Sequence, residues 1–376
     1  MDKRYRVVLI GAAHMHVLYL ARQCLENPEI ELAGFADTPP LRDEFAGEPP
    51  FTRGWNVRYV RDRLHVRFYD EYTRMLDEVR PDLAIVATET PLHVPVFEQC
   101  ARRGVAVSVE KPMAVSYADG LKMARVAERT GALLMVNWPL AWQPCMGQLK
   151  QLVDGGRIGR LVRIHQLVGH PGPLGRGVRH PMVEETSDAT TDAEKSATWW
   201  HTAALGGGSM LDFCCYGAMA CNYLVGRPAV AAAGMRLNSM HPLGDADDNA
   251  AMIVRYPDCM AVLEGSWTVP IGGTRPAPTL YGTEAMAECR AVEGGVEITV
   301  RDFFGHEEVL PVLQPQPHLK DITTAFVHHM RTGEPLPPYL DLYQNLDVLA
   351  ILDAGVRSAQ SGRTEIVPTR AWEIGG

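Results

Sequence analysis

Three polar residues, Lys111, Asp212 and Tyr216, occupy positions that suit proton transfer. Lys111 follows the apolar residues 105–109, which predict a buried strand, and a Lys at the carboxyl end of a strand can reach both a cofactor and a substrate. Asp212 and Tyr216 are four residues apart in a stretch that predicts a helix, so we expect both on one face of it. Taken alone, a Lys after a strand is more often a solvated loop residue, and a Tyr in an apolar helix is more often part of the core.

A second set of residues could bind a dinucleotide. Gly11 ends an apolar strand and is followed by Ala12-Ala13-His14-Met15-His16, where a helix N-terminus could receive a pyrophosphate through its free N–H groups. Ala13 and His16 replace two of the three glycines of the usual fingerprint, so the motif is altered. We expect the cofactor to contact Gly11, Ala13, His14 and Met15.

Asp37 strengthens the dinucleotide interpretation. It ends the second predicted strand, 21 residues after His16, where an acid would bind the adenosine ribose hydroxyls. Its carboxylate would repel a 2′-phosphate, and no Lys or Arg follows before Arg42, so the sequence favours NAD over NADP. The plainer alternative is that residues 37–40 form an ordinary turn.

The elements around these residues predict an α/β fold in two parts. In the first 138 residues, apolar runs alternate with helical patterns, which is typical of a parallel sheet built from βαβ units. Residues 38–66 are rich in Pro, Gly and Arg and predict a long loop. Beyond Pro139 we expect a helix over 146–153, a strand over 161–167, a loop over 169–198, a helix over 206–225, strands between 229 and 301, and helices near 318–331 and 339–361.

Composition limits the classes of function. The 376 residues suggest two domains, and the formal charge of −9 argues against a nucleic-acid partner. No apolar run reaches the ~20 residues of a membrane span, so we expect a cytoplasmic protein without a membrane partner. The eight Cys residues contain no C-x-x-C pair, and we assign no metal site to the Cys or His clusters at Cys214-Cys215, Cys221, His14, His16 and His328-His329.

Four segments in this order resemble the Gfo/Idh/MocA oxidoreductases: Ile10-Gly11, residues 87–93 (ATETPLH), Glu110-Lys111-Pro112, and Gly159. The resemblance covers nearly the whole chain. It implies a Rossmann NAD(P)-binding domain over residues 1–138, then a substrate-binding and oligomerisation α/β domain over residues 139–376 with a large open, mainly antiparallel sheet. It also implies that Lys111 lies beside the nicotinamide, that the Lys111–Pro112 peptide is cis, and that the cofactor-binding residues include Thr88, His93, Glu110 and Pro112.

The second domain departs from the usual pattern of the family. Tyr216 stands where most members have a catalytic His, which resembles the branch that contains glucose-fructose oxidoreductase and dimeric dihydrodiol dehydrogenase, and Trp199-Trp200 resemble that branch too. Ala141 replaces a usual Arg, and Met219 replaces a frequent Asp. These departures leave the substrate open.

The resemblance implies hydride transfer between nicotinamide and a carbinol carbon of a sugar, cyclitol or related polyol. A free Tyr, with a pKa of about 10, is a poor base at neutral pH, and a nearby ammonium group would lower that pKa. We therefore expect Tyr216 to take the hydroxyl proton, Lys111 to polarise the hydroxyl and lower the pKa of Tyr216, and Asp212 to orient the substrate or Lys111. The loop over residues 169–198, with His170, Arg179 and His180, is the candidate for substrate recognition, together with Trp199 and His201 just after it.

Two alternatives remain open at this point: a non-catalytic NAD-binding regulatory protein, and an enzyme that uses NAD transiently for elimination or glycoside cleavage. We also expect a homodimer or homotetramer, because a sheet with helices on only one face leaves a large apolar surface. Residues 250–270, with Met252, Val254, Tyr256, Leu263 and Trp267, are the candidates for that face.

Overall fold

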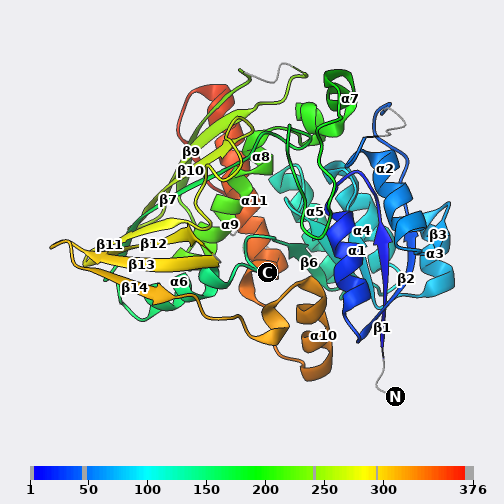
Figure 1. The fold of residues 1–376 in the computed structure, drawn as a ribbon, viewed down its shortest axis with the longest axis horizontal. Helices are drawn as coiled ribbons and strands as arrows, with labels where there is room; N and C mark the ends of the chain where they lie inside the picture. Colours follow the sequence, from blue (N-terminus) through cyan, green and yellow to red (C-terminus); the bar gives the residue numbers. More distant parts are fainter. Residues whose placement is uncertain (1–3, 45–48, 240–242, 294, 369–376) are drawn as a thin grey trace.

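The computed structural model describes residues 4–44, 49–239, 243–293 and 295–368. Its described part contains two β-sheets, with the N-terminal sheet and the C-terminal sheet on opposite sides of the long helix α11 (Leu342–Ser361) (Figure 1). The N-terminal sheet is parallel throughout and has the doubly wound order that places a crevice at the carboxyl ends of its strands. In that order its strands are β3 (Phe68–Tyr69), β2 (Ile30–Ala36), β1 (Tyr5–Ile10), β4 (Leu83–Val86), β5 (Ala106–Glu110) and β6 (Leu134–Asn137).

Helix α5 (Tyr117–Thr130) begins and ends where local signals place it. The Ser116 hydroxyl accepts the backbone N–H of Asp119 at 3.1 Å and caps α5, and Gly131 ends that helix in the left-handed region with φ of 69°. The helices that flank the parallel sheet are α1 (Val17–Glu26), α3 (Tyr72–Val79), α4 (His93–Ala101) and α5 (Tyr117–Thr130).

The loop predicted over residues 38–66 is wrong in its second half. Residues there form α2 (Arg53–Arg58) and the π-helical turn η1 (Tyr59–Arg63). Tyr59 is buried and its hydroxyl accepts the Arg22 guanidinium of α1, while Asn56 donates to the Ala12 carbonyl oxygen at 3.0 Å. The apolar positions of this segment therefore pack on the Rossmann core, and α2 supports the turn after β1.

The C-terminal sheet is large and mostly antiparallel, and only the pairing of β7 with β10 is parallel. The α/β fold class expected from the sequence is confirmed. Across the sheet the described strands are β14 (Glu307–Pro311), β13 (Gly295–Asp302), β12 (Ala285–Val292), β11 (Thr279–Gly282), β7 (Leu161–Gly169), β10 (Met260–Ser266), β9 (Asn249–Arg255), β8 (Ala231–Leu237) and β15 (Glu365–Ile366).

Helices cover one face of this sheet and leave the other open (Figure 1). The residues predicted for the open face, Met252, Val254, Tyr256, Leu263 and Trp267, are all buried, so that assignment is wrong. Because side chains alternate along a strand, the open face carries their neighbours instead, including Ile253 and Met260, which are 50% and 40% exposed. The remaining helices are α6 (Pro144–Asp154), α7 (Asp192–Ala197), α8 (Ser209–Asp212), α9 (Cys214–Val225), α10 (Ile322–Thr332) and the short η2 (Thr90–Leu92), η3 (Trp199–His201), η4 (Ala203–Leu205), η5 (Pro317–Leu319) and η6 (Pro338–Leu340).

The helix predicted over residues 206–225 is divided in two. Phe213 has φ of −116° and separates α8 from α9, so Asp212 and Tyr216 lie on different helices. The segment just before α8 requires glycine at position 207, because a Cβ on Gly207 would lie 2.1 Å from the Trp200 carbonyl oxygen. Because of this break, the Tyr216 N–H bonds the Phe213 carbonyl oxygen instead of that of Asp212. The Asp212 carbonyl oxygen can therefore accept a hydrogen bond from another part of the chain.

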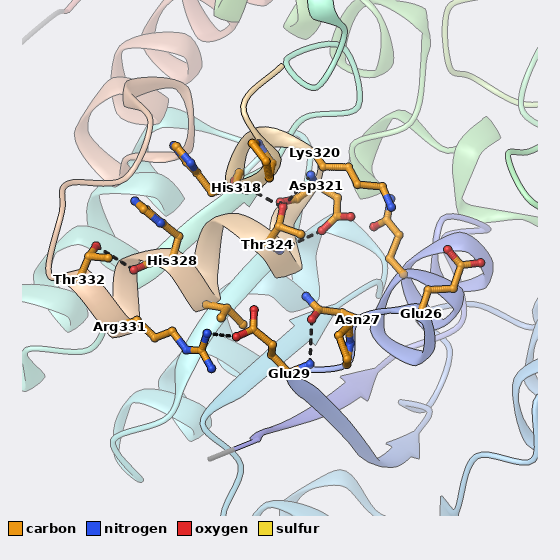
Figure 2. Close-up of a pocket in the computed structure, with 14 residues that line it drawn as sticks. Glu26, Asn27, Glu29, His318, Lys320, Asp321, Thr324, His328, Arg331 and Thr332 are labelled. Atoms are coloured by element: carbon orange, nitrogen blue, oxygen red, sulfur yellow. Dashed lines mark hydrogen bonds and ion pairs between the residues drawn. The ribbon is translucent and has the colours of Figure 1, made fainter. Parts of the chain in front are cut away.

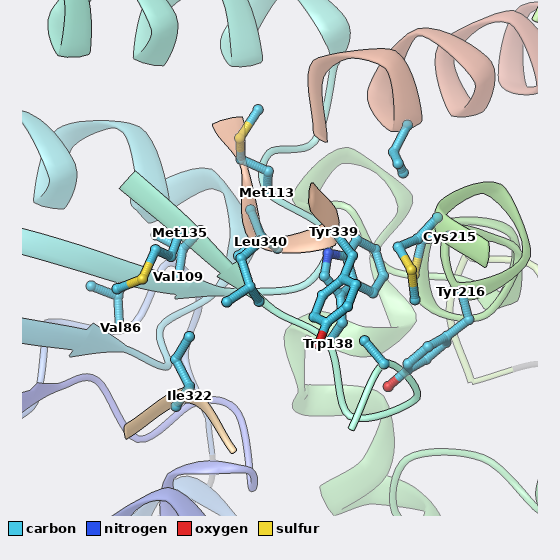
Figure 3. Close-up of a cluster of buried hydrophobic side chains, with 14 of the residues drawn as sticks. Val86, Val109, Met113, Met135, Trp138, Cys215, Tyr216, Ile322, Tyr339 and Leu340 are labelled. Carbon is cyan, nitrogen blue, oxygen red and sulfur yellow. The ribbon is translucent and has the colours of Figure 1, made fainter. Parts of the chain in front are cut away.

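The two halves share one core. The Trp138 indole donates to Asn345 of α11 at 2.9 Å, and a cluster of buried side chains runs from Val86 of β4 to Tyr216 on α9 (Figure 3). Within the described residues, we find no helix with the length and apolar content that a membrane crossing would need.

Candidate active site

The structure brings together the three residues predicted to be catalytic. Lys111, at the end of β5, donates from Nζ to Asp212 Oδ1 at 2.5 Å and to the freed Asp212 carbonyl oxygen at 2.9 Å. The two side chains are only 2% and 6% exposed. Nζ also lies 4.8 Å from the centre of the Tyr216 ring. A lysine from the first half and an acid and a phenol from the second half thus form one buried centre.

The pKa of Tyr216 in this centre is shifted in the direction opposite to the one expected from the sequence. Burial alone would lower the pKa of Lys111, but Asp212 and the other groups around it raise that pKa, so the ammonium form is favoured. Burial raises the pKa of Tyr216, and the opposing effect of Lys111 is smaller. The expectation that Lys111 would lower the pKa of Tyr216 below its usual value is therefore wrong, because burial dominates and Asp212 already pairs with the ammonium charge.

Asp212 has a second side-chain partner besides Lys111. Its second oxygen, Oδ2, accepts the indole N–H of Trp267 at 3.0 Å, so both carboxylate oxygens have protein partners. Trp267 follows β10 and was not identified as a site residue from the sequence. The structure favours an orienting role for Asp212 toward Lys111 over direct contact with a substrate.

A cavity of about 360 Å³ opens beside Tyr216. Gln166 of β7 lines it and is only 4% exposed, and its side-chain oxygen has no hydrogen-bond partner among the described residues. The sequence carried a signal for this residue, since Gln166 is a polar side chain two positions after the apolar Ile164 in the strand predicted over 161–167. Its carboxamide can bind a hydroxyl group of a ligand next to Tyr216. The other residues that line the cavity are Pro139, Leu140, Gln143, Leu167, Val168, Thr274, Arg275 and Pro276.

The turn after β1 fits a dinucleotide at its first glycine. Gly11 has φ of 92°, and a Cβ there would lie 2.4 Å from Thr88, so only glycine can form this cradle. Asp37 ends β2 as predicted, and its Oδ1 accepts the Ala12 N–H at 2.8 Å. Asp37 can therefore hold the turn and present its carboxylate to ribose hydroxyls.

A cation lies directly beside Asp37, contrary to the sequence argument. Arg53 of α2 donates to both carboxylate oxygens of Asp37, at 3.0 and 3.1 Å. The same guanidinium pairs with Glu44 at 3.1 Å and with Glu89. Sequence spacing could not reveal Arg53, because a tertiary contact brings it back over 16 residues. One cation and three carboxylates leave this Arg53 cluster with a formal net charge of −2.

The rest of the predicted cofactor residues are buried around the same crevice. His93 Nδ1 bonds the Met113 carbonyl oxygen at 3.1 Å, and burial lowers the pKa of His93 to about 4, so it is neutral. Glu110 contacts His16 Nδ1 at 3.0 Å and accepts the amide of Asn137 at 2.8 Å. The Lys111–Pro112 peptide is cis, as predicted, and His14 and Met15 are buried.

The residues predicted for substrate recognition lie partly over the turn after β1. The Trp199 indole donates to the Ala13 carbonyl oxygen at 3.4 Å, and the ring of His180 lies 6.0 Å from that of His16. By contrast, His170 and His201 pack on Phe213 and Trp267 and so border the Lys111 centre. Arg179 is exposed near Asp188. Trp199 and His180 thus lie at the turn, and His170 and His201 lie at the Lys111 centre.

A separate cavity lies away from the Lys111 centre. It has a volume of about 490 Å³ and lies between the end of α1 and α10, where Asn27, Glu29 and Asp321 face His318 and His328 (Figure 2). Its position sets it apart from the Lys111 centre.

A doubly wound parallel sheet with a glycine turn after β1 belongs to the dinucleotide-binding class of α/β folds. Comparison with known families agrees. Residues 5–138 match the oxidoreductase family with an NAD-binding Rossmann fold, and residues 146–288 match the Gfo/Idh/MocA C-terminal domain. This chain belongs to the Gfo/Idh/MocA oxidoreductase family, and its N-terminal half is an NAD-binding Rossmann domain.

Two relatives match different shares of the chain. D-apiose dehydrogenase of Paraburkholderia graminis is 34% identical over 42% of this chain and 38% of its own length. Trans-1,2-dihydrobenzene-1,2-diol dehydrogenase of Mus musculus is 28% identical over 62% of each chain. The matched segments thus span less than two thirds of either relative.

Solved structures share the fold over nearly the whole chain. An oxidoreductase from Agrobacterium radiobacter in complex with NAD⁺, L-tartaric acid and magnesium has a TM-score of 0.74 at 16% identity, covering 97% of this chain and 99% of its own. An aldose-aldose oxidoreductase from Caulobacter crescentus complexed with glycerol has a TM-score of 0.71 at 21% identity, covering 97% and 100%.

Proposed function

We propose that this protein is an NAD-dependent dehydrogenase that acts on a CH–OH group of a sugar, cyclitol or related polyol. The observation that carries the proposal is the buried Lys111–Asp212 pair, which joins the two halves beside Tyr216 and its cavity. A protein that only holds NAD has no need of this arrangement. The names of the two relatives, dehydrogenases of a sugar and of a cyclic diol, support the same substrate class.

A bound nicotinamide cofactor would accept a hydride when an alcohol is oxidised and, in its reduced form, would donate one when a carbonyl group is reduced, and the chain would manage the proton and the charge. When a carbonyl group is reduced, Tyr216 donates the proton from Oη, a role that its raised pKa supports. Lys111 stabilises the negative charge that develops on the substrate oxygen, and Asp212 with Trp267 holds the ammonium group in place. In the opposite direction the phenol must first ionise, so alcohol oxidation should become faster as the pH rises.

The test is to incubate the protein with NAD and a panel of sugars, cyclitols and sugar acids and to follow the absorbance of the reduced cofactor. A substrate-dependent rise supports a dehydrogenase. Product formation without net reduction of NAD would point to transient oxidation for elimination or glycoside cleavage. NAD binding without turnover of any compound in either direction would favour a regulatory protein.

We also propose that the open face of the C-terminal sheet binds a second copy of this chain. Ile253 of β9, Met260 of β10 and Met235 of β8 are exposed on neighbouring strands, and an apolar sheet face of this kind suits an interface with a second copy. Sedimentation at micromolar concentration should show a dimer or tetramer, and Ile253→Glu should shift it toward monomer. A wild-type chain that sediments only as a monomer would contradict this assembly.

A further inference from the structure

Among the described residues that line the cavity beside Tyr216, one side chain is charged, that of Arg275. No described Asp or Glu lines this cavity, although the chain as a whole carries a formal charge of −9. The cavity volume of about 360 Å³ lies within the range of about 300–1,000 Å³ that is typical of small-molecule sites. A ligand in this cavity therefore meets positive charge on its described walls.

Arg275 lies in the segment between β10 and β11, which begins with Trp267. Pro276 follows Arg275, and a residue before proline is restricted to extended backbone conformations. The same segment thus supplies Trp267, the partner of Asp212, and Arg275, which lines the cavity. It connects the cation of the cavity to the Lys111 centre through one short stretch of chain.

The charge of Arg275 is only partly neutralised by its neighbours. Arg275 pairs with Glu288 Oε2 at 2.7 Å, while Arg290 donates to Oε1 of the same carboxylate at 2.8 and 2.6 Å. Glu307 pairs in turn with Arg290 and Arg301, so these ion pairs join three arginines to two glutamates. The Glu288 side chain is 6% exposed, whereas that of Arg275 is 54% exposed. Glu288 therefore anchors one nitrogen of the guanidinium and leaves the others for a ligand.

Gln166 supplies a second polar group to the cavity. Its side chain is buried, and the side-chain oxygen has no hydrogen-bond partner among the described residues. A buried polar atom without a partner is unusual in a native protein. This oxygen can accept a hydroxyl hydrogen of a polyol, while the planar guanidinium of Arg275 matches the two oxygens of a carboxylate. The two groups together suit a molecule that carries both hydroxyl groups and a carboxylate.

We propose that the substrate is a sugar acid, whose carboxylate binds Arg275 while its reacting carbon lies at Tyr216 and another hydroxyl group donates to Gln166. This inference rests on the proposed function and narrows its substrate class to polyols that carry a carboxylate. Three contacts at different points of one small molecule fix its orientation, which brings one carbinol carbon to the reacting centre. The hydride and the proton leave that carbinol as described above, and the carboxylate takes no part in the chemistry.

The experiment compares matched acidic and neutral compounds on the full chain in the presence of NAD. The pairs are D-glucuronate with D-glucose, D-galacturonate with D-galactose, and D-gluconate with D-glucitol. Initial rates give kcat/KM, and calorimetry gives the affinity without any need for turnover. In at least one pair the acid should exceed its neutral partner by about tenfold or more, because it gains a charge-assisted contact with Arg275. Equal values within every pair, or no binding of any acid, would overturn the proposal.

The two readouts separate this inference from the proposed function. Oxidation of neutral sugars without a preference for acids would leave the dehydrogenase standing and contradict the sugar-acid site. Acids that bind about tenfold more tightly than their neutral partners but are not oxidised would support the site and contradict the dehydrogenase. D-glucose 6-phosphate is added because a guanidinium also binds phosphate, and tighter binding of this ester than of the sugar acids would contradict the assignment of a carboxylate.

Variants locate the carboxylate of the substrate. Arg275→Gln should weaken binding of the acid by about tenfold more than binding of its neutral partner, and Arg275→Lys, which keeps the charge, should lose less. The matched control is Arg290→Gln, which also removes a partner of Glu288 but does not line the cavity, so the preference for the acid should remain. Each of these variants leaves Glu288 at least one arginine, so we expect them to fold, which circular dichroism checks. A preference for acids that persists in folded Arg275→Gln would contradict the assignment.

Discussion

Lys111 and Arg53 are both buried cations paired with acids, but they have different numbers of partners. Lys111 has one acid, Asp212, and the pair is formally neutral. Arg53 has the three acids of its cluster, so negative charge is in excess there. Buried charges must be paired at both places. The two places differ in the net charge that a bound ligand would meet.

The two net charges suit two different ligands, the substrate at Lys111 and the cofactor ribose at the Arg53 cluster. A neutral pair beside Tyr216 can respond to negative charge that develops on a substrate oxygen. An acid-rich cluster at the end of β2 suits neutral ribose hydroxyls and opposes a phosphate. Changes that alter either charge balance should therefore have distinct effects, on turnover at Lys111 and on cofactor choice and stability at Arg53.

The largest effect is expected at the neutral centre, from Tyr216→Phe. Removing the hydroxyl should lower kcat by ~10²–10⁴, the usual contribution of general acid–base catalysis, and should leave NAD affinity unchanged. Tyr216→His should retain some activity and move the pH optimum toward the imidazole range. Steady-state kinetics in both directions measure these effects, and normal turnover by Tyr216→Phe would show that the hydroxyl is only a structural group.

Lys111→Met should lower kcat by ~10²–10³, since one positioned charge is lost. The variant also leaves Asp212 buried without its cation, so the free energy of unfolding should fall. Adding Asp212→Asn should recover stability and leave turnover low, which separates the catalytic role of Lys111 from its structural role. Turnover restored by the second substitution would contradict the assignment.

Arg53→Met should mainly destabilise the fold, by ~3–5 kcal/mol at neutral pH, because three carboxylates lose their shared partner. Burial raises the pKa of Glu44 against the opposing effect of Arg53, so loss of Arg53 should raise that pKa further. A buried acid with a raised pKa opposes folding at neutral pH and ceases to do so once both states are protonated, so the deficit should shrink as the pH falls. Denaturant unfolding at several pH values would test this, and a deficit independent of pH would contradict it.

NAD should be preferred to NADP, and the structure sharpens the test. Asp37→Ala alone should shift the preference toward NADP by roughly tenfold, about 1.4 kcal/mol, because it removes the repelling carboxylate and frees part of the Arg53 guanidinium. In the matched control, Asp37→Ala with Arg53→Met, the gain should disappear. Equal binding of NAD and NADP by the wild type in comparative titrations would show that the Arg53 cluster does not select the cofactor.

The smallest effect is expected in the Tyr216 cavity. Gln166→Leu keeps the approximate volume and removes a hydrogen-bonding group, so KM for the polyol should rise about fivefold, for roughly 1 kcal/mol, with little change in kcat. Gln143→Leu, at an exposed position of the same cavity, is the control and should change KM less. A fall in kcat without a change in KM would place Gln166 in the chemistry instead of in recognition.

The sequence by itself determined the α/β class, the turn at Gly11, the acid at the end of β2, and the set of Lys111, Asp212 and Tyr216. These features depend on residue type, on the periods of strands and helices, and on the ends of elements, all of which are local. Family resemblance then related Lys111 and Tyr216 to a shared centre.

Only the tertiary structure decided the charges and the neighbours. Burial, which no spacing reveals, raises the pKa of Tyr216 against the effect of Lys111. The packing of α2 brings Arg53 to Asp37, and the fold of β5 against the turn brings Glu110 to His14 and His16. The physical reason is the same in each case: Coulombic and desolvation energies depend on distances and solvent exposure that arise from contacts between residues far apart in the chain.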